Sequence, residues 1–258
     1  MTTPSFEIPP FEIDEGLIQH LRAAQHVVVL TGAGISAESG VPTFRDALTG
    51  LWAKYDPQEL ATPEAFRNNP RLVWEWYAWR RNLVSEVEPN PGHLALAALE
   101  RRVSEFTLIT QNVDSLHQRA GSTLVIELHG NLSRVKCSEE DRIVETWADS
   151  GDIPPRCPFC GGMLRPDVVW FGEMLPVQEL RRAIQASRSA DMFLTIGTSA
   201  LVQPAASLPF EALENGAEVI EINIDRTPLS PWMTYTLQGK AGVILPALIE
   251  AAWPTNRK

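Results

Sequence analysis

The sequence lacks the long hydrophobic runs and leader-like features of membrane and secreted proteins. No apolar run in its 258 residues approaches the roughly 20 residues that cross a bilayer. The first segment, Met1 to Glu15, combines proline, phenylalanine and acidic residues, without the basic start and apolar core of a secretory signal. We therefore expect a cytoplasmic protein with no membrane partner.

Basic residues are in the minority. The chain has 22 Lys and Arg against 32 Asp and Glu, so its net charge is −10. A surface of this sign repels nucleic acid and suits a cationic peptide better. We expect no direct nucleic-acid partner.

Cysteine is scarce, and the cysteines lie close together in the sequence. Cys137, Cys157 and Cys160 are the three cysteines of the chain. An odd number in a cytoplasmic protein argues against a disulfide framework. Their segment, residues 131–166, is polar and interrupts the pattern of the rest of the chain. We therefore predict a small inserted zinc-ribbon-like lobe there.

What the sequence does contain is an alternation of apolar strands and helical patterns. With 44% hydrophobic residues, the chain can bury the core of one large domain. Alternation of this kind predicts an α/β fold, a Rossmann-like parallel sheet with helices on both faces. The large domain is expected over 15–130 and 167–258, with a helical insertion at about 46–88. The predicted strands are His26–Leu30, Phe106–Thr110, Leu124–Leu128, Asp191–Ile196 and Glu218–Ile222.

The helical insertion is rich in tryptophan. Trp74, Trp76 and Trp79 lie on one predicted helix that opens at Pro70. Such a helix suits either a core or a subunit interface, so it predicts no particular oligomeric state.

Polar or glycine-rich clusters follow the carboxyl ends of all five predicted strands. In an open α/β sheet, ligands bind at this edge. A single cluster could simply mark a loop, but five together favour one binding site. The first cluster, Gly32-Ala-Gly34, follows a buried strand, as in loops that hold a phosphate at a helix N-terminus. It departs from a dehydrogenase fingerprint because a Pro-Thr-Phe-Arg loop, Pro42 to Arg45, comes before any long helix.

Several motifs together resemble the sirtuins, which are NAD-dependent protein-lysine deacylases. They occur in the order of that family and span about residues 26–245. The resemblance implies that NAD is consumed as a co-substrate, with cleavage of the nicotinamide–ribose bond and release of O-acyl-ADP-ribose. It also implies acylated-lysine proteins or peptides as partners. The motifs are Gly-Ala-Gly-Ile-Ser (32–36), Pro-Thr-Phe-Arg (42–45), Thr-Gln-Asn-Val-Asp (110–114), Leu-His-Gly (128–130), Val-Val-Trp-Phe-Gly-Glu (168–173), Gly-Thr-Ser (197–199) and Asn223.

The resemblance assigns roles to individual residues. His129 matches the catalytic base, and an imidazole with a pKa of about 6.5 suits that role. Asn112 and Asp114 match groups that orient the ribose and the carboxamide, and Phe44 and Arg45 belong to an expected mobile flap over NAD. The alternatives are a structural role for His129, turn formation for Asn112 and Asp114, ordinary packing for Phe44 and a solvated surface position for Arg45. The full set of expected cofactor-binding residues is Gly32, Ala33, Gly34, Ala37, Phe44, Arg45, Gln111, Asn112, Val113, Asp114, Gly197, Thr198, Ser199, Asn223 and Ala241.

A finer resemblance concerns the acyl group. Ala61, Tyr77 and Arg80 match the small residue and the Tyr-x-x-Arg pair of the desuccinylase and demalonylase branch. Tyr77 and Arg80 are three residues apart and so share a helix face, where they could hold a carboxylate. The Val168 to Phe171 segment is expected to bind a peptide as an added strand. A general deacetylase, a protein mono-ADP-ribosyltransferase and a non-catalytic NAD-binding or acyl-lysine-binding module are the alternatives.

The zinc lobe departs from the family pattern. The second Cys-x-x-Cys pair is intact at Cys157 and Cys160, but Glu140 stands where the partner of Cys137 is expected. Structural zinc sites prefer Cys and His, although a carboxylate can also bind zinc. Three outcomes therefore remain open: zinc bound by three cysteines with Glu140 or Asp141, zinc bound weakly with water, or no zinc.

Overall fold

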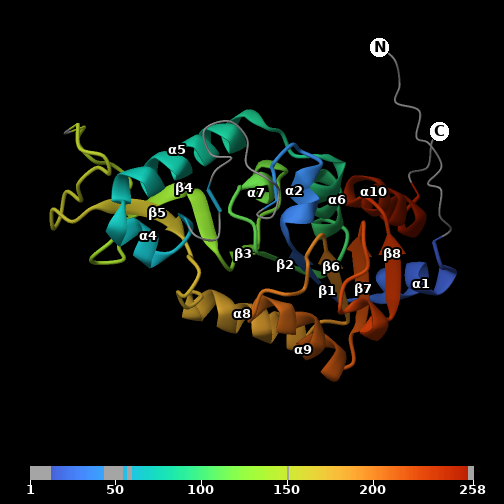
Figure 1. Cartoon of the computed structure of the whole chain (residues 1–258). Helices are drawn as coiled ribbons and strands as arrows, with labels where there is room; N and C mark the ends of the chain where they lie inside the picture. The colour runs from blue at the N-terminus through green and yellow to red at the C-terminus, as the bar shows by residue number, and fades with distance from the viewer. Residues whose placement is uncertain (1–12, 44–54, 57–59, 150, 255–258) are drawn as a thin grey trace, which may run out of the picture.

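The computed structural model describes residues 13–43, 55–56, 60–149 and 151–254 (Figure 1). The helices and strands over these residues are, in chain order, α1 (Glu15–Ala23), β1 (His26–Thr31), α2 (Ala33–Ala37), α4 (Pro63–Asn68), α5 (Pro70–Glu86), α6 (Pro91–Glu100), β2 (Glu105–Thr110), α7 (Leu116–Arg119), β3 (Val125–Glu127), β4 (Gly130–Cys137), β5 (Leu164–Val168), α8 (Val177–Arg188), β6 (Met192–Ile196), η2 (Ala205–Ser207), α9 (Leu208–Glu214), β7 (Glu218–Asn223), η3 (Ser230–Trp232), β8 (Tyr235–Gln238) and α10 (Ala241–Ala252).

The main sheet has the strand order of a Rossmann fold. Its order is β3-β2-β1-β6-β7-β8, and all of its neighbouring strands pair in parallel. The order reverses between β1 and β6, where the chain crosses from one half of the sheet to the other. Ligands bind to such sheets beyond the carboxyl ends of the strands at this switch point.

Helices cover both faces of this sheet, as Figure 1 shows. Strand β1 is buried along its whole length because it contacts both layers. Val27 and Val29 face a core formed with α1, α6 and α10. Val28 and Leu30 face a core formed with α8 and α9. Alternation along a strand explains why Val27 to Leu30 is apolar without interruption.

A second part of the molecule lies to the left in Figure 1 and contains α4, α5, β4 and β5. Strands β4 and β5 form an antiparallel pair. The buried face of α5 packs against it, with Trp76 and Tyr77 in one cluster with Leu132, Val168 and Trp170. Local sequence fixes the start of these helices: Thr62 Oγ1 accepts the Ala65 N–H at 3.0 Å, and a proline occupies the first turn of both α4 and α5.

The predicted α/β class and the parallel Rossmann-like sheet are confirmed. Strand β8 and helix α10 were not predicted from the sequence. Strand β8 is only half-buried, and α10 contains Pro246, which usually interrupts a helix. Strands β4 and β5 extend slightly beyond the predicted lobe at 131–166. Among the described residues, no helix is both long and apolar enough to span a bilayer.

The loop after β1 and the loop after β6 cross in close contact at the switch point. Three glycines allow this crossing: Gly32, Gly34 and Gly197. The Gly34 N–H donates to the Gly197 carbonyl at 2.8 Å. A Cβ on Gly32 or Gly34 would lie 2.8 Å from the backbone of Gly197 or Thr198. Gly197 has a φ of +59°, and a Cβ there would lie 2.5 Å from the Ile35 nitrogen. The glycines of the first motif are therefore required by contact between backbones.

This crossing predicts that Gly197→Ala destabilises the protein more than Gly216→Ala. Gly216 also has a positive φ, +88°, but a Cβ there would meet nothing within 4 Å. Both substitutions add the left-handed cost of about 1–2 kcal/mol. Gly197→Ala adds overpacking of roughly 1–3 kcal/mol. Urea unfolding of the two variants measures the difference, and equal free energies of unfolding would contradict the crossing.

Candidate active site

Most of the predicted site residues meet beyond the carboxyl end of the main sheet. The glycine-rich loop that begins at Gly32 follows β1. Gln111 to Asp114 follow β2, and His129 follows β3. Gly197 to Ser199 follow β6, and Asn223 ends β7. The loops are joined to one another: Gln111 Nε2 donates to Thr198 Oγ1 at 3.0 Å, and Asn223 Nδ2 donates to the Thr198 carbonyl at 2.9 Å.

The remaining positions of the predicted cofactor set surround this edge. Ala33 begins α2 and Ala37 is exposed at its end. Val113 is half-buried and its carbonyl accepts the Leu132 N–H. Ala241 is buried at the start of α10, where Glu38 Oε1 accepts the Gly242 N–H at 2.9 Å. Phe44 and Arg45, the expected flap residues, lie outside the described residues.

A buried hydrogen-bond network underlies these loops. Asn112 Nδ2 donates to the Gly32 carbonyl at 3.0 Å and to Ser36 Oγ at 3.1 Å. The Ser36 hydroxyl donates to Asp114 Oδ2 at 2.7 Å. Burial raises the pKa of Asp114, although the Leu116 N–H, the Ser36 hydroxyl and the charge of Arg80 each lower it. Asn112 and Asp114 are thus held rigidly against the first loop.

Two buried histidines complete the network, and sequence analysis missed both. The Asn90 N–H donates to His93 Nδ1, so His93 carries its proton on Nε2, which lies 3.4 Å from Ser36 Oγ. Thr31 gives its hydroxyl proton to Thr110, so His117 Nε2 donates to Thr31 Oγ1 at 2.9 Å. The two imidazole rings are 4.9 Å apart.

Both buried histidines are neutral in the folded protein. Burial lowers the pKa of His93 to about 4. Burial, and then the neighbouring His93, lower the pKa of His117 to about 3. The Asn90-Pro91-Gly92 sequence before His93 was a signal for its position, because Asn90 and His93 form the capping box of α6.

His129 is half-buried at the end of β3 and has a defined tautomer. Its Nδ1 lies 2.9 Å from the Gln111 carbonyl oxygen. A carbonyl can only accept, so Nδ1 carries the proton and Nε2 has a free lone pair. Burial lowers the pKa of this imidazole, which the bond to Gln111 partly opposes, so the ring is neutral near pH 7.

The residues expected to contact an acyl group lie together in the second part of the molecule. Ala61 and Tyr77 are buried in the same cluster, and the Ala61 carbonyl accepts the Phe171 N–H at 2.9 Å. The Arg80 guanidinium carbon lies 5.0 Å from the centre of the Trp76 ring. Burial lowers the pKa of Arg80, and electrostatic interactions with Tyr77 and Asp114 oppose that effect. Arg80 therefore interacts electrostatically both with Tyr77, a predicted acyl residue, and with Asp114 of the buried network.

Main-chain hydrogen bonds hold the Val168 to Phe171 segment, which is expected to bind a peptide. Val168 is buried at the end of β5, and the Val169 N–H donates to the His129 carbonyl at 2.9 Å. Phe171 is 44% exposed. The segment therefore joins His129 to Ala61 through main-chain hydrogen bonds.

The cysteine cluster has a donor set that fits zinc. One ligand atom from each of Cys137, Glu140, Cys157 and Cys160 lies within 4.8 Å of all the others. Three thiolates and a carboxylate at this spacing can surround one tetrahedral ion with bonds of about 2.0–2.3 Å. Asp141 lies outside this set, and its carboxylate is 2.7 Å from Lys136 Nζ.

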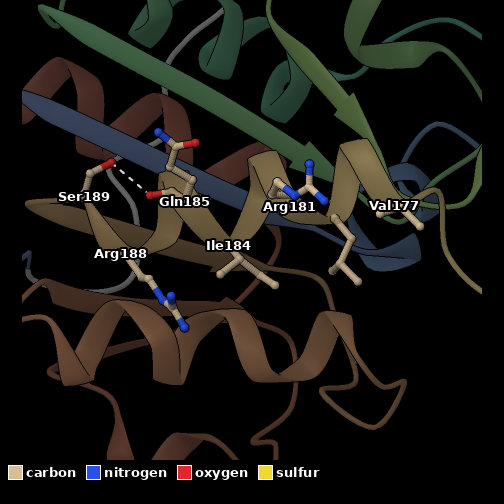
Figure 2. Close-up of a pocket in the computed structure, with 7 residues that line it drawn as sticks. Val177, Arg181, Ile184, Gln185, Arg188 and Ser189 are labelled. Atoms are coloured by element: carbon tan, nitrogen blue, oxygen red, sulfur yellow. Dashed lines mark hydrogen bonds between the residues drawn. The ribbon is translucent and has the colours of Figure 1, made fainter.

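A separate groove of about 580 Å³ runs along α8. Figure 2 shows its side chains spread along this helix and the following Ser189. Arg188 Nε donates to Glu211 Oε2 of α9 at 2.7 Å. None of the predicted site residues lines this groove, so it is distinct from the carboxyl edge of the sheet.

The buried histidines predict a loss of stability in acid. In the unfolded chain each histidine has a pKa of about 6.5. As the pH falls, the histidines of the unfolded chain are therefore protonated before those of the folded protein. The stabilisation is fully present above about pH 6.5 and is lost as the pH falls toward the folded-state pKa values of about 4 for His93 and about 3 for His117. From about pH 7.5 to about pH 5, the pair should lower the free energy of unfolding by about 4 kcal/mol. Urea titrations measure this, and His117→Gln should halve the pH dependence; an unchanged dependence would contradict the prediction.

Comparison with known proteins identifies the family. The Sir2 family model matches residues 32–204. The chain is 58% identical over 206 residues to the NAD-dependent protein deacylase of Aquifex aeolicus, covering 80% of this chain and 86% of that one. It is 48% identical over 254 residues to NAD-dependent protein deacylase 1 of Pseudomonas aeruginosa, covering 92% and 98%.

Solved structures of Sir2 proteins are also similar to this chain. A crystal structure of a Sir2 homolog–NAD complex superposes with a TM-score of 0.87 at 49% identity, covering 93% of this chain and 94% of that one. Sir2 bound to an acetylated peptide gives a TM-score of 0.82 at 32% identity, covering 92% and 97%. The resemblance drawn from the motifs is thus confirmed, and the chain belongs to the Sir2 family.

Proposed function

We propose that this chain is an NAD-dependent protein-lysine deacylase that prefers acidic acyl groups: succinyl, malonyl and glutaryl. Similarity to proteins named NAD-dependent protein deacylases supports the general activity. The preference rests on one observation: Tyr77 and Arg80 lie on one turn of α5, beside the buried Ala61. The products would be nicotinamide, the free lysine and O-acyl-ADP-ribose.

NAD fits the edge of the sheet at the switch point. The glycine crossing leaves the N-terminus of α2 and the loop after β6 as two adjacent backbone surfaces. Gln111 and Asn223 both bond to Thr198, so they would fix the loop that meets the adenosine. When bound, NAD supplies the ribose carbon from which nicotinamide leaves. The protein supplies the groups that orient it and exclude water.

His129 is suited to act as the general base of this reaction. Its Nδ1–H donates to the Gln111 carbonyl, so the bare Nε2 can accept a proton from a ribose hydroxyl. A lowered pKa keeps the ring in the basic form near pH 7. Asn112 and Asp114, held by Ser36, would orient the ribose and the carboxamide.

The acyl pocket is suited to a chain that ends in a carboxylate. Ala61 is small and would leave room for a longer acyl group. Tyr77 can donate one O–H, and Arg80 presents a charged fork of N–H donors. Charge-assisted hydrogen bonds of this type are stronger than neutral ones and select for an anion.

A general deacetylase is the second candidate. Sir2 bound to an acetylated peptide resembles this chain at 32% identity, which favours acetyl-lysine as a substrate for the common fold. The two candidates differ in whether the carboxylate of the acyl group contributes to kcat/KM. Comparing acetyl-lysine and succinyl-lysine peptides of the same sequence separates them.

Arg80→Met should remove the preference for acidic acyl groups. Hydrogen bonds to a charged partner contribute about 1.5–3 kcal/mol, so the succinyl-to-acetyl ratio of kcat/KM should fall about 10- to 100-fold. Nicotinamide release with matched peptides measures this ratio. Arg81→Met is the control, because Arg81 stacks on Trp74 instead and should keep the ratio. Equal rates on the two peptides in the unmodified enzyme would exclude the acidic preference.

We also propose that Glu140 completes a structural zinc site with Cys137, Cys157 and Cys160. The compact donor set supports this assignment, and Asp141 is engaged by Lys136 instead. A zinc ion there would join the end of β4, which carries Cys137, to the segment with Cys157 and Cys160 that precedes β5. Its contribution is to the shape and stability of the second part of the molecule.

Glu140→Gln should weaken zinc binding while leaving the cysteines intact. The purified protein should hold about one zinc per chain, and a chelator should remove it about tenfold faster from Glu140→Gln, since an amide lacks the carboxylate charge. Zinc release followed by a colorimetric indicator measures the rate. Glu139→Gln, at an exposed neighbouring position, is the control. Equal release from both variants would show that Glu140 is not a ligand.

A further inference from the structure

We infer that Trp170 determines acyl specificity by making Tyr77 a hydrogen-bond donor. The inference rests on the proposed acidic-acyl preference and adds a positioning residue to it. Trp170 was singled out in the sequence only as part of a family motif. In the structure it is 2% exposed, and its indole Nε1 lies 3.0 Å from the Tyr77 hydroxyl oxygen.

The direction of this hydrogen bond is fixed by chemistry. An indole N–H can only donate, so the Tyr77 oxygen must accept. A neutral phenol has one proton, and that proton is then directed to another acceptor. Burial raises the pKa of Tyr77 to about 12, although the charge of Arg80 and the bond from Trp170 lower it, so the phenol keeps its proton. A carboxylate is an acceptor only, which matches a donating Tyr77.

Trp170 is itself held in one orientation. The Arg165 guanidinium carbon lies 3.3 Å from the centre of the Trp170 ring. Arg165 is bound by both oxygens of Glu173, at 2.6 and 2.9 Å. Glu173 Oε2 also accepts the Trp170 backbone N–H at 2.8 Å. The centre of the Phe66 ring lies 5.3 Å from the centre of the Trp170 ring.

The contacts with Arg165, Glu173 and Phe66 therefore hold the Trp170 ring with its indole N–H directed at Tyr77. Tyr77 lies on the same face of α5 as Arg80, whose guanidinium carbon is 6.0 Å from the Tyr77 ring. The neutral Tyr77 hydroxyl and the Arg80 cation would then be presented together to the acyl group. An acetyl group has no carboxylate to use either of them, so the arrangement favours acidic acyl chains.

The test is a double-mutant cycle on substrate preference. The succinyl-to-acetyl ratio of kcat/KM is measured by nicotinamide release for the unmodified enzyme, Trp170→Phe, Tyr77→Phe and the double variant. We expect each single substitution to lower the ratio about tenfold, and the double variant to match Tyr77→Phe. Trp74→Phe is the matched control: Trp74 packs in a different hydrophobic cluster from Tyr77, with its ring centre 6.5 Å from that of Trp147, so the ratio should not change.

The outcomes separate this inference from the proposed function. If the unmodified enzyme shows no succinyl preference, the proposed function fails. If Tyr77→Phe lowers the ratio but Trp170→Phe does not, or if the two effects simply add, the role of Trp170 is overturned while the acidic preference stands. Where Trp170→Phe does not fold, benzothienylalanine at position 170 keeps both rings and lacks the N–H, and the same fall in ratio is expected.

Discussion

Backbone segments meet at the carboxyl end of the main sheet more closely than any side chain allows. Gly34 and Gly197 hydrogen-bond across this contact, and a Cβ on either would overlap the other loop. The crossing brings the start of α2 against the end of β6. Ser36, one turn into α2, is thereby placed where Asn112 and Asp114 can bond to it. The arrangement of polar groups at this edge follows from that one backbone contact.

The buried network and the acyl residues are linked through charge. Arg80 influences both Tyr77 and Asp114, which belong to the two parts of the molecule. Trp170 and Arg165 extend the same chain of contacts to β5. The side chains proposed to bind the acyl group and those of the buried network are thus connected by these contacts.

The sheet and its binding edge could be predicted because their signals are local. Val27 to Leu30 is a continuous apolar run, and polar clusters follow each strand directly. The family motifs added the candidate site residues. The Asn90-Pro91-Gly92 sequence marks the position of His93 at a helix start. The contacts of His93 with Ser36 and of His117 with Thr31 could not be found from local signals, because the partners are 57 and 86 residues away in the chain. The same holds for Trp170 and Tyr77, which are 93 residues apart. Only the packing of α5 against β4 and β5 brings this pair together.

The proposed acyl preference requires Tyr77 and Arg80 to receive the carboxylate of an acidic acyl-lysine. A crystal structure of the enzyme with a succinyl-lysine peptide tests it most directly. We expect the succinyl carboxylate to accept hydrogen bonds from the Tyr77 hydroxyl and the Arg80 guanidinium, with the Trp170 N–H still donating to Tyr77. A succinyl carboxylate that points to solvent, with neither side chain in contact, would contradict the account.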